Sequence, residues 1–486
     1  MEEFKKLGLS ENVINALRKK GYVTPTEIQR RAIPILLEGK LDIIAQSQTG
    51  TGKTVSFALP IIEKITENSR HVQAIILTPT RELAIQVSKE IESLVGNKRL
   101  RVLAVYGGTP INEQIRKLSQ GVDIVVGTPG RVIDQIKRKC LDLFKVTFVV
   151  LDEADEMLNM GFLEEIEKIL QKTGPNKQML LFSATMPKAI HKIAKSFMRE
   201  HVVLETENKQ LTIGLTEQIY YEVMPRDRFD ALRRIIDINE DFYGIVFCRT
   251  RSEVDVLARQ LIDQSYSAAA IHGDISQEQR EKILNLFRAK RVNILIATDV
   301  AARGIDVNDL THVVNFSLPQ SPESYVHRIG RTGRAGKKGA AVTLITPSER
   351  NRLKFIEKIV KKELEKRELP SINQVIEFKK KHIKQTVEQS IKSGKSKSYE
   401  EIAKEILVSN SPVSALASLL EYAFKSVLNP NNYKEIHGIT SSHRTSKNSR
   451  KESFGNGYRK RRSDSDDNNK FEGRSRARNK SRSFRR

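Results

Sequence analysis

Short apolar runs that alternate with helical stretches are the feature that most limits what this 486-residue chain can fold into. This alternation predicts α/β domains built on parallel sheets. The unbroken apolar character of the runs predicts strands that are covered on both faces. The runs form two series, at 41–47, 74–80, 101–108, 122–128, 146–153 and 178–185, and then at 243–250, 266–274, 292–299, 311–317 and 340–346.

The domain organisation follows from where these series begin and end. The polar segment "ETENKQLTIG" separates them and is predicted to be a linker. We expect no strand beyond Pro347, where the chain changes to helical apolar spacing. The last residues are rich in Ser, Asn, Arg and Gly, too polar to fold alone, and are predicted to be disordered. The predicted division is 1–205 for the first α/β domain, 206–214 for the linker, 215–365 for the second α/β domain, 371–430 for a small all-helical module and 431–486 for a disordered basic tail.

The formal net charge of +24 is unevenly distributed along the chain. From Ser441 to Arg486 there are 16 Lys and Arg against 5 Asp and Glu, a net charge of +11. This asymmetry indicates a polyanionic partner, with nucleic acid favoured over an acidic membrane surface. No apolar run approaches the roughly 20 residues that span a bilayer, and the N-terminus "MEEFKKLGLS" does not resemble a signal peptide. Two cysteines without a CxxC pair argue against a disulfide framework or zinc ribbon and favour a reducing cytoplasm.

A glycine-rich segment, "SQTGTGKT", follows the first apolar run at residues 47–54. Its glycines allow backbone N–H groups to surround phosphate oxygens at the N-terminus of the following helix. Lys53 would contact the β- and γ-phosphates, and Thr54 would ligate Mg²⁺. Ser47 stands where the general phosphate-loop pattern has glycine. The alternative is a tight structural turn, but TGxGKT between a strand and a helix favours nucleotide binding.

Four carboxylates follow another apolar run, in "VVLDEADEML" at 149–158. Acids favour the first turn of a helix, which is one explanation for them. A phosphate loop, however, needs a carboxylate at the end of a nearby strand to hold Mg²⁺. Asp152 is predicted to do this through water, and Glu153 to orient and deprotonate the attacking water. Asp155 is expected to bond to neighbouring loops, and Glu156 to be a solvated helix acid.

Together with these segments, an ordered set of motifs resembles the DEAD-box RNA helicases, in particular bacterial members of the cold-shock type. Asp152-Glu153-Ala154-Asp155 spells the family's signature, and the likeness extends from residue 1 to about 350. Ser47 departs from the alanine that the family usually has. The other matching segments are "GYVTPTEIQ" (21–29), "PTRELA" (79–84), Gly107-Gly108, "TPGR" (128–131), "SAT" (183–185), "ATDVAARGID" (297–306) and "HRIGRTGR" (327–334).

The resemblance implies two tandem RecA-like domains that hydrolyse ATP and locally unwind RNA. Residues 2–30 would read adenine, because Gln29 carries the donor and acceptor that pair with its edge. Tyr22 would offer an aromatic face, and Phe4 would pack against this segment. The remaining nucleotide contacts implied in the first domain are Gln48, Thr49, Gly50, Thr51, Gly52, Lys53 and Thr54.

The second domain would supply cationic groups to the nucleotide. Arg331 and Arg334 resemble the family's arginine fingers, Asp306 the residue facing the ribose, and His327 a residue near the attacking water. Hydrolysis would then require closure of the two domains. The resemblance also implies contacts to the RNA backbone and elements coupling it to ATP: Thr80, Arg81, Gly108, Thr128, Arg131, Arg249, Thr250, Gly273 and Thr298 for RNA, and Ser183, Thr185 and Asp155 for coupling.

The C-terminal region leaves several alternatives open. The helical module is either a dimerisation domain, as in many bacterial relatives, or an appendage packed on its own motor. The basic tail either holds RNA electrostatically or is solvated without a defined contact. Single-stranded or duplex RNA is the expected partner, and family roles in ribosome assembly, mRNA decay and cold adaptation leave ribosomes and ribonucleases as candidate partners. The competing functions are a DNA-directed motor and an ATP-gated RNA clamp.

Overall fold

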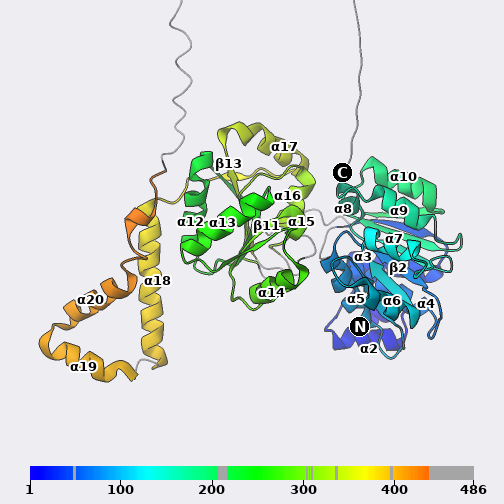
Figure 1. Ribbon diagram of the computed structural model, residues 1–486, viewed down its shortest axis with the longest axis horizontal. Coiled ribbons are helices and arrows are strands. Elements are labelled where there is room, and N and C mark those ends of the chain that lie inside the picture. Colours follow the sequence, from blue (N-terminus) through cyan, green and yellow to red (C-terminus); the bar gives the residue numbers. More distant parts are fainter. Residues whose placement is uncertain are drawn as a thin grey trace, which may run out of the picture. The chain divides into compact units, whose positions relative to one another are not determined.

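The computed structural model describes residues 1–47, 51–205, 216–302, 305, 307, 310–333, 338–394 and 398–436 (Figure 1). The predicted linker at 206–214 and nearly all of the predicted tail lie outside the described residues. Two seven-stranded sheets dominate the fold, followed by a helical region. In the described part of the chain, no helix combines the length and apolar character needed to cross a membrane.

The first sheet is parallel throughout, with strand order β3-β4-β2-β5-β6-β1-β7. Every residue of β2, β4, β5 and β6 is buried, which confirms that these strands are covered on both faces. The six apolar runs of the first series supply β1–β6. The strands are β1 (Asp42–Gln46), β2 (Ala74–Leu77), β3 (Val102–Val105), β4 (Ile124–Gly127), β5 (Phe148–Leu151), β6 (Gln178–Ser183) and β7 (His201–Glu205).

Helices cover this sheet on two sides, and each side has its own apolar core. Because neighbouring strand residues point to opposite faces, Ile43 belongs to one core cluster and Ile44 to the other. Phe57 of α4 packs on Phe182 of β6 with ring centroids 5.4 Å apart. The helices are α1 (Glu2–Lys5), α2 (Glu11–Lys19), α3 (Glu27–Glu38), α4 (Lys53–Lys64), α5 (Arg81–Leu94), α6 (Ile111–Ser119), α7 (Pro129–Lys137), α8 (Ala154–Asn159), α9 (Leu163–Leu170) and α10 (Lys188–Phe197).

The second sheet repeats the architecture of the first, with strand order β10-β11-β9-β12-β13-β8-β14, all parallel. Its strands are β8 (Thr216–Glu222), β9 (Gly244–Cys248), β10 (Ala268–Ile271), β11 (Ile294–Thr298), β12 (His312–Asn315), β13 (Gly339–Ile345) and β14 (Glu365–Lys366). Its helices are η1 (Pro225–Asp227), α12 (Arg228–Asp237), α13 (Arg251–Asp263), α14 (Gln277–Arg288), α15 (Asp299–Ala302), α16 (Pro322–Ile329), η2 (Pro347–Glu349) and α17 (Arg350–Val360).

The expectation that no strand follows Pro347 is wrong. The two-residue strand β14 pairs with β8 at the edge of the second sheet. Both of its residues are exposed and charged, so no apolar run marks it. The fold class of tandem parallel-sheet α/β domains is confirmed.

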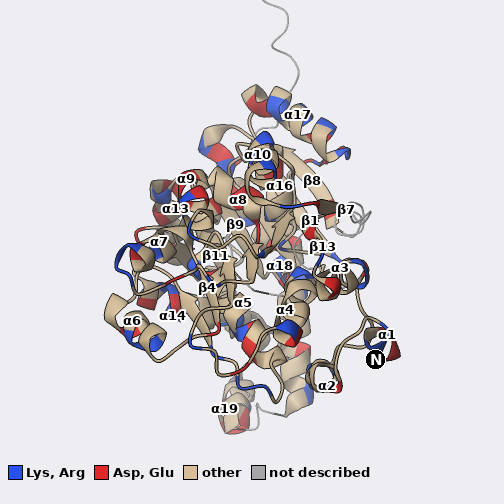
Figure 2. Cartoon of the chain, turned by 90° about the vertical axis from the view of Figure 1, so that its right-hand side faces the viewer, with Lys and Arg blue, Asp and Glu red and all other residues tan. Residues whose placement is uncertain are grey.

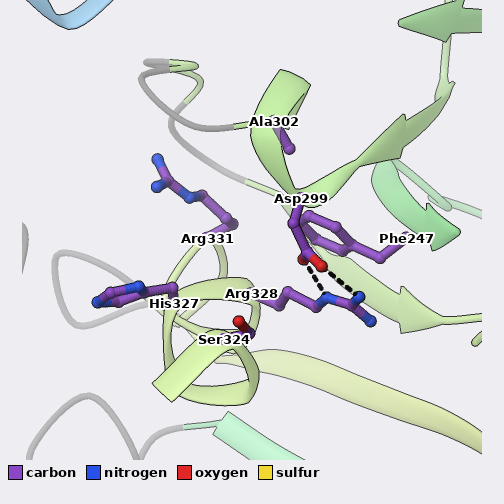
Figure 3. Close-up of a pocket in the computed structure, with 7 residues that line it drawn as sticks. All are labelled: Phe247, Asp299, Ala302, Ser324, His327, Arg328 and Arg331. Atoms are coloured by element: carbon purple, nitrogen blue, oxygen red, sulfur yellow. Dashed lines mark hydrogen bonds and ion pairs between the residues drawn. The ribbon is translucent and has the colours of Figure 1, made fainter. Parts of the chain in front are cut away.

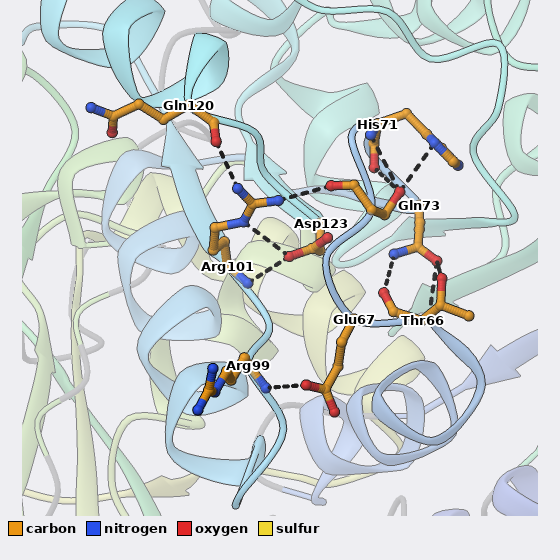
Figure 4. Close-up of polar contacts among 9 residues, drawn as sticks. Thr66, Glu67, His71, Gln73, Arg99, Arg101, Gln120 and Asp123 are labelled. Atoms are coloured by element: carbon orange, nitrogen blue, oxygen red, sulfur yellow. Dashed lines mark hydrogen bonds and ion pairs between the residues drawn. The ribbon is translucent and has the colours of Figure 1, made fainter.

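A polar network fixes the loops at the amino ends of three strands in the first sheet (Figure 4). The Arg101 side chain donates to Gln120 O at 2.6 Å and to Ser69 O at 2.8 Å, and its backbone N–H donates to the buried Asp123 carboxylate at 2.8 Å. Gln73 is tied to Thr66 by its side-chain amide, with Nε2 2.7 Å from Thr66 O. This edge of the sheet is therefore occupied by structural bonds, whereas the motif residues follow the carboxyl ends of the strands.

The chain ends in a helical region made of α18 (Ile372–Ser393), α19 (Glu400–Ser409), α20 (Pro412–Phe424) and η4 (Pro430–Asn432). The first turns of α18 pack on α12, where Val375 and Ile376 form a small core with Tyr433. The Tyr433 hydroxyl donates to Asp237 of α12 at 2.5 Å, and Arg233 donates to Asn432 O at 2.7 Å. The residues after α20 therefore return to the second domain, and the predicted all-helical module is confirmed.

Candidate nucleotide and RNA site

The described part of the phosphate loop joins β1 to α4. Gly52 caps α4 with φ +87, a left-handed conformation that favours glycine, and a Cβ there would lie 2.4 Å from Gln29 Nε2. The buried Lys53 ammonium donates to Ser47 O at 3.0 Å, so it lies across the loop. Thr54 follows in the first turn of α4. The predicted contacts Gln48, Thr49 and Gly50 lie outside the described residues.

The predicted adenine-reading segment packs directly on this loop. Gln29 is fully buried, and its amide donates to Gly52 O at 3.1 Å and accepts from Thr26 N at 3.0 Å. Among the described residues, one amide hydrogen and one oxygen lone pair of Gln29 have no partner, and these are the two groups that an adenine edge needs. The Tyr22 hydroxyl donates to Glu90 at 3.2 Å, and burial raises the pKa of Tyr22 to about 12. Phe4 is fully buried in the core cluster that holds Ile28, so it supports the segment from beneath.

The carboxylates after β5 are held in a strained and dehydrated turn. Asp152 is 3% exposed, and burial raises its pKa to about 6 even though Lys53 acts to lower that pKa. Its Oδ1 accepts from the backbone N–H of Glu153 at 3.0 Å. Glu153 has φ +51 and ψ +51, a left-handed conformation that costs roughly 1–2 kcal/mol in a residue with a side chain. Such strain is common at functional sites, where the surrounding structure maintains it.

Asp155 connects this turn to the segment after β6. Its Oδ2 accepts from both the backbone N–H and the hydroxyl of Thr185, each at 2.9 Å. The Ser183 hydroxyl donates to Thr185 O at 2.5 Å. The structure therefore brings together the three residues that the sequence assigns to coupling, and Asp155 bonds to a neighbouring loop as expected.

The candidate RNA contacts of the first domain gather where strands end. Thr80 caps α5 and accepts from Leu83 N at 3.3 Å, which places Arg81 in the first helical turn. The Arg81 guanidinium lies against Gly108, which has φ +86. Arg131, from the first turn of α7, donates to Thr109 O at 3.4 Å. Thr128 caps this helix and completes the set.

The candidate RNA contacts of the second domain lie at matching places. Thr250 caps α13 and accepts from Glu253 N at 3.1 Å. Gly273 follows β10 and lies against the Arg251 guanidinium. Thr298 ends β11. Arg249 is exposed, and its backbone N–H donates to Glu253 at 2.7 Å.

A hollow in the second domain places the predicted cationic residues (Figure 3). Arg328 lines it, with Nη2 2.8 Å from Asp299 Oδ2 and Nη1 3.0 Å from Asn315 Oδ1. Arg331 and His327 point away from Arg328 on the same side, and Arg331 donates to Ile305 O at 3.2 Å. Arg334 and Asp306 lie outside the described residues.

Comparisons with known proteins identify the arrangement. The sequence profile of the DEAD/DEAH box helicases matches residues 26–193, and that of the helicase conserved C-terminal domain matches 227–336. The chain is 52% identical over 364 residues to "Probable ATP-dependent RNA helicase MJ0669" of Methanocaldococcus jannaschii, covering 75% of this chain and 97% of that protein. It is 46% identical over 421 residues to the DEAD-box ATP-dependent RNA helicase CshA of Geobacillus kaustophilus, covering 87% and 90%. The chain belongs to the DEAD-box ATP-dependent RNA helicases.

Solved structures agree on the fold. Dbp5 of Saccharomyces cerevisiae bound to RNA and ADP BeF3 superposes with a TM-score of 0.71 at 31% identity, covering 78% of this chain and 99% of that one. Mss116p bound to single-stranded RNA and AMP-PNP gives a TM-score of 0.68 at 28% identity, covering 77% and 80%. The two RecA-like domains of this helicase are therefore the family's motor.

One acid of this helicase differs from expectation. Glu156 was expected to be a solvated helix acid, but it is 2% exposed and forms an ion pair with His327 of the second domain. Burial alone would lower the pKa of His327, but the hydrogen bond and charge of Glu156, with smaller contributions from Asp155 and Glu153, raise it. The DEAD turn therefore carries a contact to the second domain that the sequence alone does not indicate.

The helicase has a second such contact that sequence reasoning missed. Arg280 of α14 has its Nε 2.7 Å from Oε1 of Glu82, which lies in the "PTRELA" segment of α5. Both side chains are largely buried, and Arg280 also donates to Ala301 O at 2.6 Å. Glu82 adjoins Arg81, so this pair joins the candidate RNA contacts of the first domain to the second domain. Arg280 and Glu82 are almost 200 residues apart, so a single sequence gives no indication that they form a contact.

Proposed function

We propose that ATP binds on the phosphate loop of the first domain, with Mg²⁺ held by Thr54 and by Asp152 through water. The observation that carries this assignment is the buried Asp152 carboxyl, raised to a pKa of about 6 beside Lys53. A buried carboxyl with a raised pKa is costly unless a cation occupies the site, and its strand end is where this fold binds ligands. Bound Mg²⁺ would neutralise charge on the phosphates.

Glu153 is proposed as the base that orients and deprotonates the attacking water. Its left-handed backbone turns the chain sharply after β5, and its neighbour Asp152 accepts its backbone N–H. As the water oxygen bonds to the γ-phosphorus, its proton would pass to the Glu153 carboxylate, the bond from the γ-phosphorus to the β–γ bridging oxygen would break, and ADP would leave. Gln29 and Tyr22 are proposed to hold adenine, since Gln29 keeps one free donor and one free acceptor beside the loop.

Arg331, Arg334 and His327 are proposed to complete the site from the second domain, with Asp306 at the ribose. The ion pairs His327–Glu156 and Arg280–Glu82 support a closed arrangement in which both domains contribute. Since Arg280–Glu82 adjoins Arg81, closure is also proposed to tie the RNA contacts to the nucleotide. The Asp155–Thr185–Ser183 bonds would transmit the state of the site to the segment after β6.

RNA is proposed to cross the carboxyl ends of the strands in both sheets. Hydroxyls, glycine backbone and Arg hold a sugar–phosphate backbone without reading its sequence. Lys and Arg alternate with acids on helices such as α3 and α6, so the described surface is mixed in charge (Figure 2). We propose that the basic tail adds non-specific affinity for RNA.

The decisive experiment measures ATP hydrolysis with no nucleic acid, with single-stranded RNA and with matched DNA. Glu153→Gln is expected to lower the RNA-stimulated rate by roughly 10²–10⁴-fold while RNA binding with ATP persists. Glu164→Gln, a change of an exposed α9 acid, is the matched control and should behave as wild type.

The outcomes separate the competing functions. Equal stimulation by DNA would favour a DNA-directed motor. Tight retention of RNA with a non-hydrolysable ATP analogue and no strand release would favour an ATP-gated clamp. Hydrolysis that ignores RNA, or a Glu153→Gln protein as fast as wild type, would contradict the assignment of the base and its coupling.

The helical arm, defined as residues 372–424, is proposed to form a homodimer. All residues of α19 and α20 are described, and none is buried, although α20 is largely apolar. Val408 is 85% exposed and Tyr422 is 91% exposed, and exposed apolar side chains of this kind support an interaction surface. The Lys residues of α18 and the acids of α19 are complementary in charge, as two copies related by a two-fold axis require.

Light scattering on the full chain tests the dimer. Leu419→Glu on α20 should convert a dimer into a monomer, because it places a charge in the covered face. Phe355→Glu is the control, since Phe355 is an equally exposed apolar residue on α17 outside the arm. A monomeric wild type at micromolar concentration would favour an appendage that acts on its own motor.

The remaining assignments are proposals of broader scope. We propose the domain boundaries 1–205, 215–365 and 371–430, with the tail beginning at 431 although residues 432–434 contact α12. The free cysteines Cys140 and Cys248 support a reducing cytoplasm as the compartment. Ribosome assembly and mRNA decay, with ribosomes or ribonucleases as partners, are proposed as the candidate pathways.

A further inference from the structure

The two sheets present one arginine each in the same structural setting. In the first domain, Thr80 caps α5 and Arg81 is its first residue. In the second domain, Thr250 caps α13 and Arg251 is its first residue. The preceding strands, β2 and β9, hold the same place in the two sheet orders. Arg251, rather than Arg249, is therefore the counterpart of Arg81.

The glycines beside these arginines extend the correspondence. Gly108 follows β3 and Gly273 follows β10, the strands at matching edges of the two sheets. A Cβ on Gly108 would lie 2.0 Å from Arg81 Nη1, and one on Gly273 would lie 3.3 Å from Arg251 Nη2. Each guanidinium thus lies against a glycine, where an RNA backbone could approach closely.

The next residue breaks the correspondence. Thr109 follows Gly108, but Asp274 follows Gly273, and the Asp274 carboxylate lies 2.5 Å from Arg251 Nη1. Both of these side chains are 61% exposed, so solvent and ligands can reach the pair. Within the part of the chain that the structure describes, Arg81 forms no ion pair. Only the arginine of the second domain is paired with an acid.

We propose that Arg251 is a phosphate-contacting residue of the second domain and that Asp274 is a built-in competitor for it. This inference rests on the proposed RNA face, which it deepens. A carboxylate and a phosphate oxygen make the same charge-assisted bond to a guanidinium, so an RNA phosphate competes with Asp274 for Nη1 of Arg251. The second domain therefore grips RNA less tightly than the first and releases it more readily.

The competition between Asp274 and RNA for Arg251 is weak, because both side chains of the ion pair are exposed to solvent. Ion pairs between exposed side chains stabilise by an amount that corresponds to roughly a two- to fivefold change in an equilibrium constant. Asp274 should therefore weaken RNA binding by about that factor without preventing it. The carboxylate adjusts the lifetime of the RNA complex, and it leaves the ATP site untouched.

A double-mutant cycle on the full chain tests the proposal, using fluorescent single-stranded RNA with a non-hydrolysable ATP analogue. Asp274→Asn should tighten RNA binding about two- to fivefold in the wild-type background. In an Arg251→Ala background it should have no effect, because nothing remains to compete for. Arg251→Ala alone should weaken binding and lower the slope of log affinity against log salt by roughly 0.7. ATP affinity without RNA should be unchanged throughout.

Two controls make the outcome decisive. Arg259→Ala, a change of an exposed arginine on the same helix α13, should have little effect on RNA affinity or salt slope, because Arg259 is not among the candidate RNA contacts. If Asp274→Asn tightens RNA binding equally in the wild-type and Arg251→Ala backgrounds, general repulsion of RNA by the carboxylate is responsible and the competition is refuted. The competition is also refuted if Asp274→Asn does not tighten RNA binding in the wild-type background. Arg81→Ala distinguishes failure of the Arg251–Asp274 proposal from failure of the proposed RNA face. Weaker binding in Arg81→Ala with no change in Arg251→Ala refutes only this inference, whereas no change in either refutes the proposed RNA face.

Discussion

The ends of β5 and β12 occupy the same place in two sheets of identical strand order, yet they carry opposite chemistry. β5 runs into Asp152 and Glu153, an acidic turn beside the phosphate loop. β12 ends in Asn315 and continues to Ser317, whose oxygens accept from Arg328 at 3.0 and 2.8 Å. One domain therefore places acids where the other anchors α16, the helix that carries His327 and Arg328, and under the proposed function each domain contributes half of an ATP-hydrolysing site.

The segments after β1 and β8 differ in the same way. β1 leads into the glycine-rich phosphate loop, whereas β8 leads through Met224 into η1 with no glycine before α12. At this position in the two sheets, the glycine-rich turn that can surround phosphate with backbone N–H groups belongs to the first domain. The two domains thus share a fold but differ at this strand end, and under the proposed function the second domain acts on a nucleotide held by the first.

The largest effect is expected from removing the cation that the second domain contributes. Arg331→Ala should lower the RNA-stimulated kcat by roughly 10³-fold, the lower end of what arginine fingers contribute to phosphoryl transfer. The affinity for ATP should change little, because the first domain holds the nucleotide. Single-turnover ATP hydrolysis measures this. Arg259→Ala, an exposed α13 arginine, is the matched control, and an equal loss in both proteins would contradict the assigned role.

The contact between domains should have the next largest effect. Glu82→Gln or Arg280→Gln leaves a largely buried charge without its partner, which should lower kcat/KM for RNA by about 10- to 100-fold. The double variant should recover part of the loss, since neither charge then stays unpaired. RNA-dependent ATPase assays on the four proteins measure the coupling. Additive losses would show that the pair does not act in closure.

The Mg²⁺ requirement of the ATPase should depend on pH through protonation of Asp152. The pKa of Asp152 is raised to about 6 by burial, so the ligand-free carboxyl is protonated below that pH and cannot bind a cation. The Mg²⁺ concentration for half-maximal ATPase should rise about tenfold per pH unit below 6 and stay level above 7. Titrations of Mg²⁺ between pH 5 and 8 measure it, with RNA binding without nucleotide as the control. If the Mg²⁺ concentration for half-maximal ATPase does not change down to pH 5, the cation does not bind through Asp152.

The apolar runs predicted the central strands because these are buried on both faces. The strands that were missed, β7, β8 and β14, lie at or next to the edge of their sheets. β7 and β14 are largely exposed, and β8 (TEQIYYE) mixes polar with apolar residues, so none shows an unbroken apolar run. An apolar run marks a strand only where its residues are both buried and apolar, and these three strands are either exposed or, in β8, partly polar.

The residues of the site also fall into those that the sequence predicts and those that it does not. Residues that act through local geometry, such as Gly52, Lys53 and Asp152, were predictable because loop, helix and strand end are contiguous in sequence. Glu156 and Arg280 were not, because their roles depend on partners in the other domain. For the same reason the sequence indicates Arg249 but not Arg251, whose position as first residue of α13 matches that of Arg81 in α5 only in the fold.

The smallest expected effect compares the two glycines directly. Gly108 has φ +86, and a Cβ would collide with Arg81, so Gly108→Ala should displace this guanidinium and weaken RNA binding several-fold. Gly273 has no left-handed φ, and a Cβ would meet only the flexible end of Arg251 at 3.3 Å, so Gly273→Ala should change RNA affinity by less than about twofold. RNA titrations measure both, with thermal unfolding to check that each protein folds. Equal losses of RNA affinity in the two variants would mean that the glycines of both domains contribute alike to RNA binding. The difference between the domains that we infer from Asp274 would then not extend to these glycines.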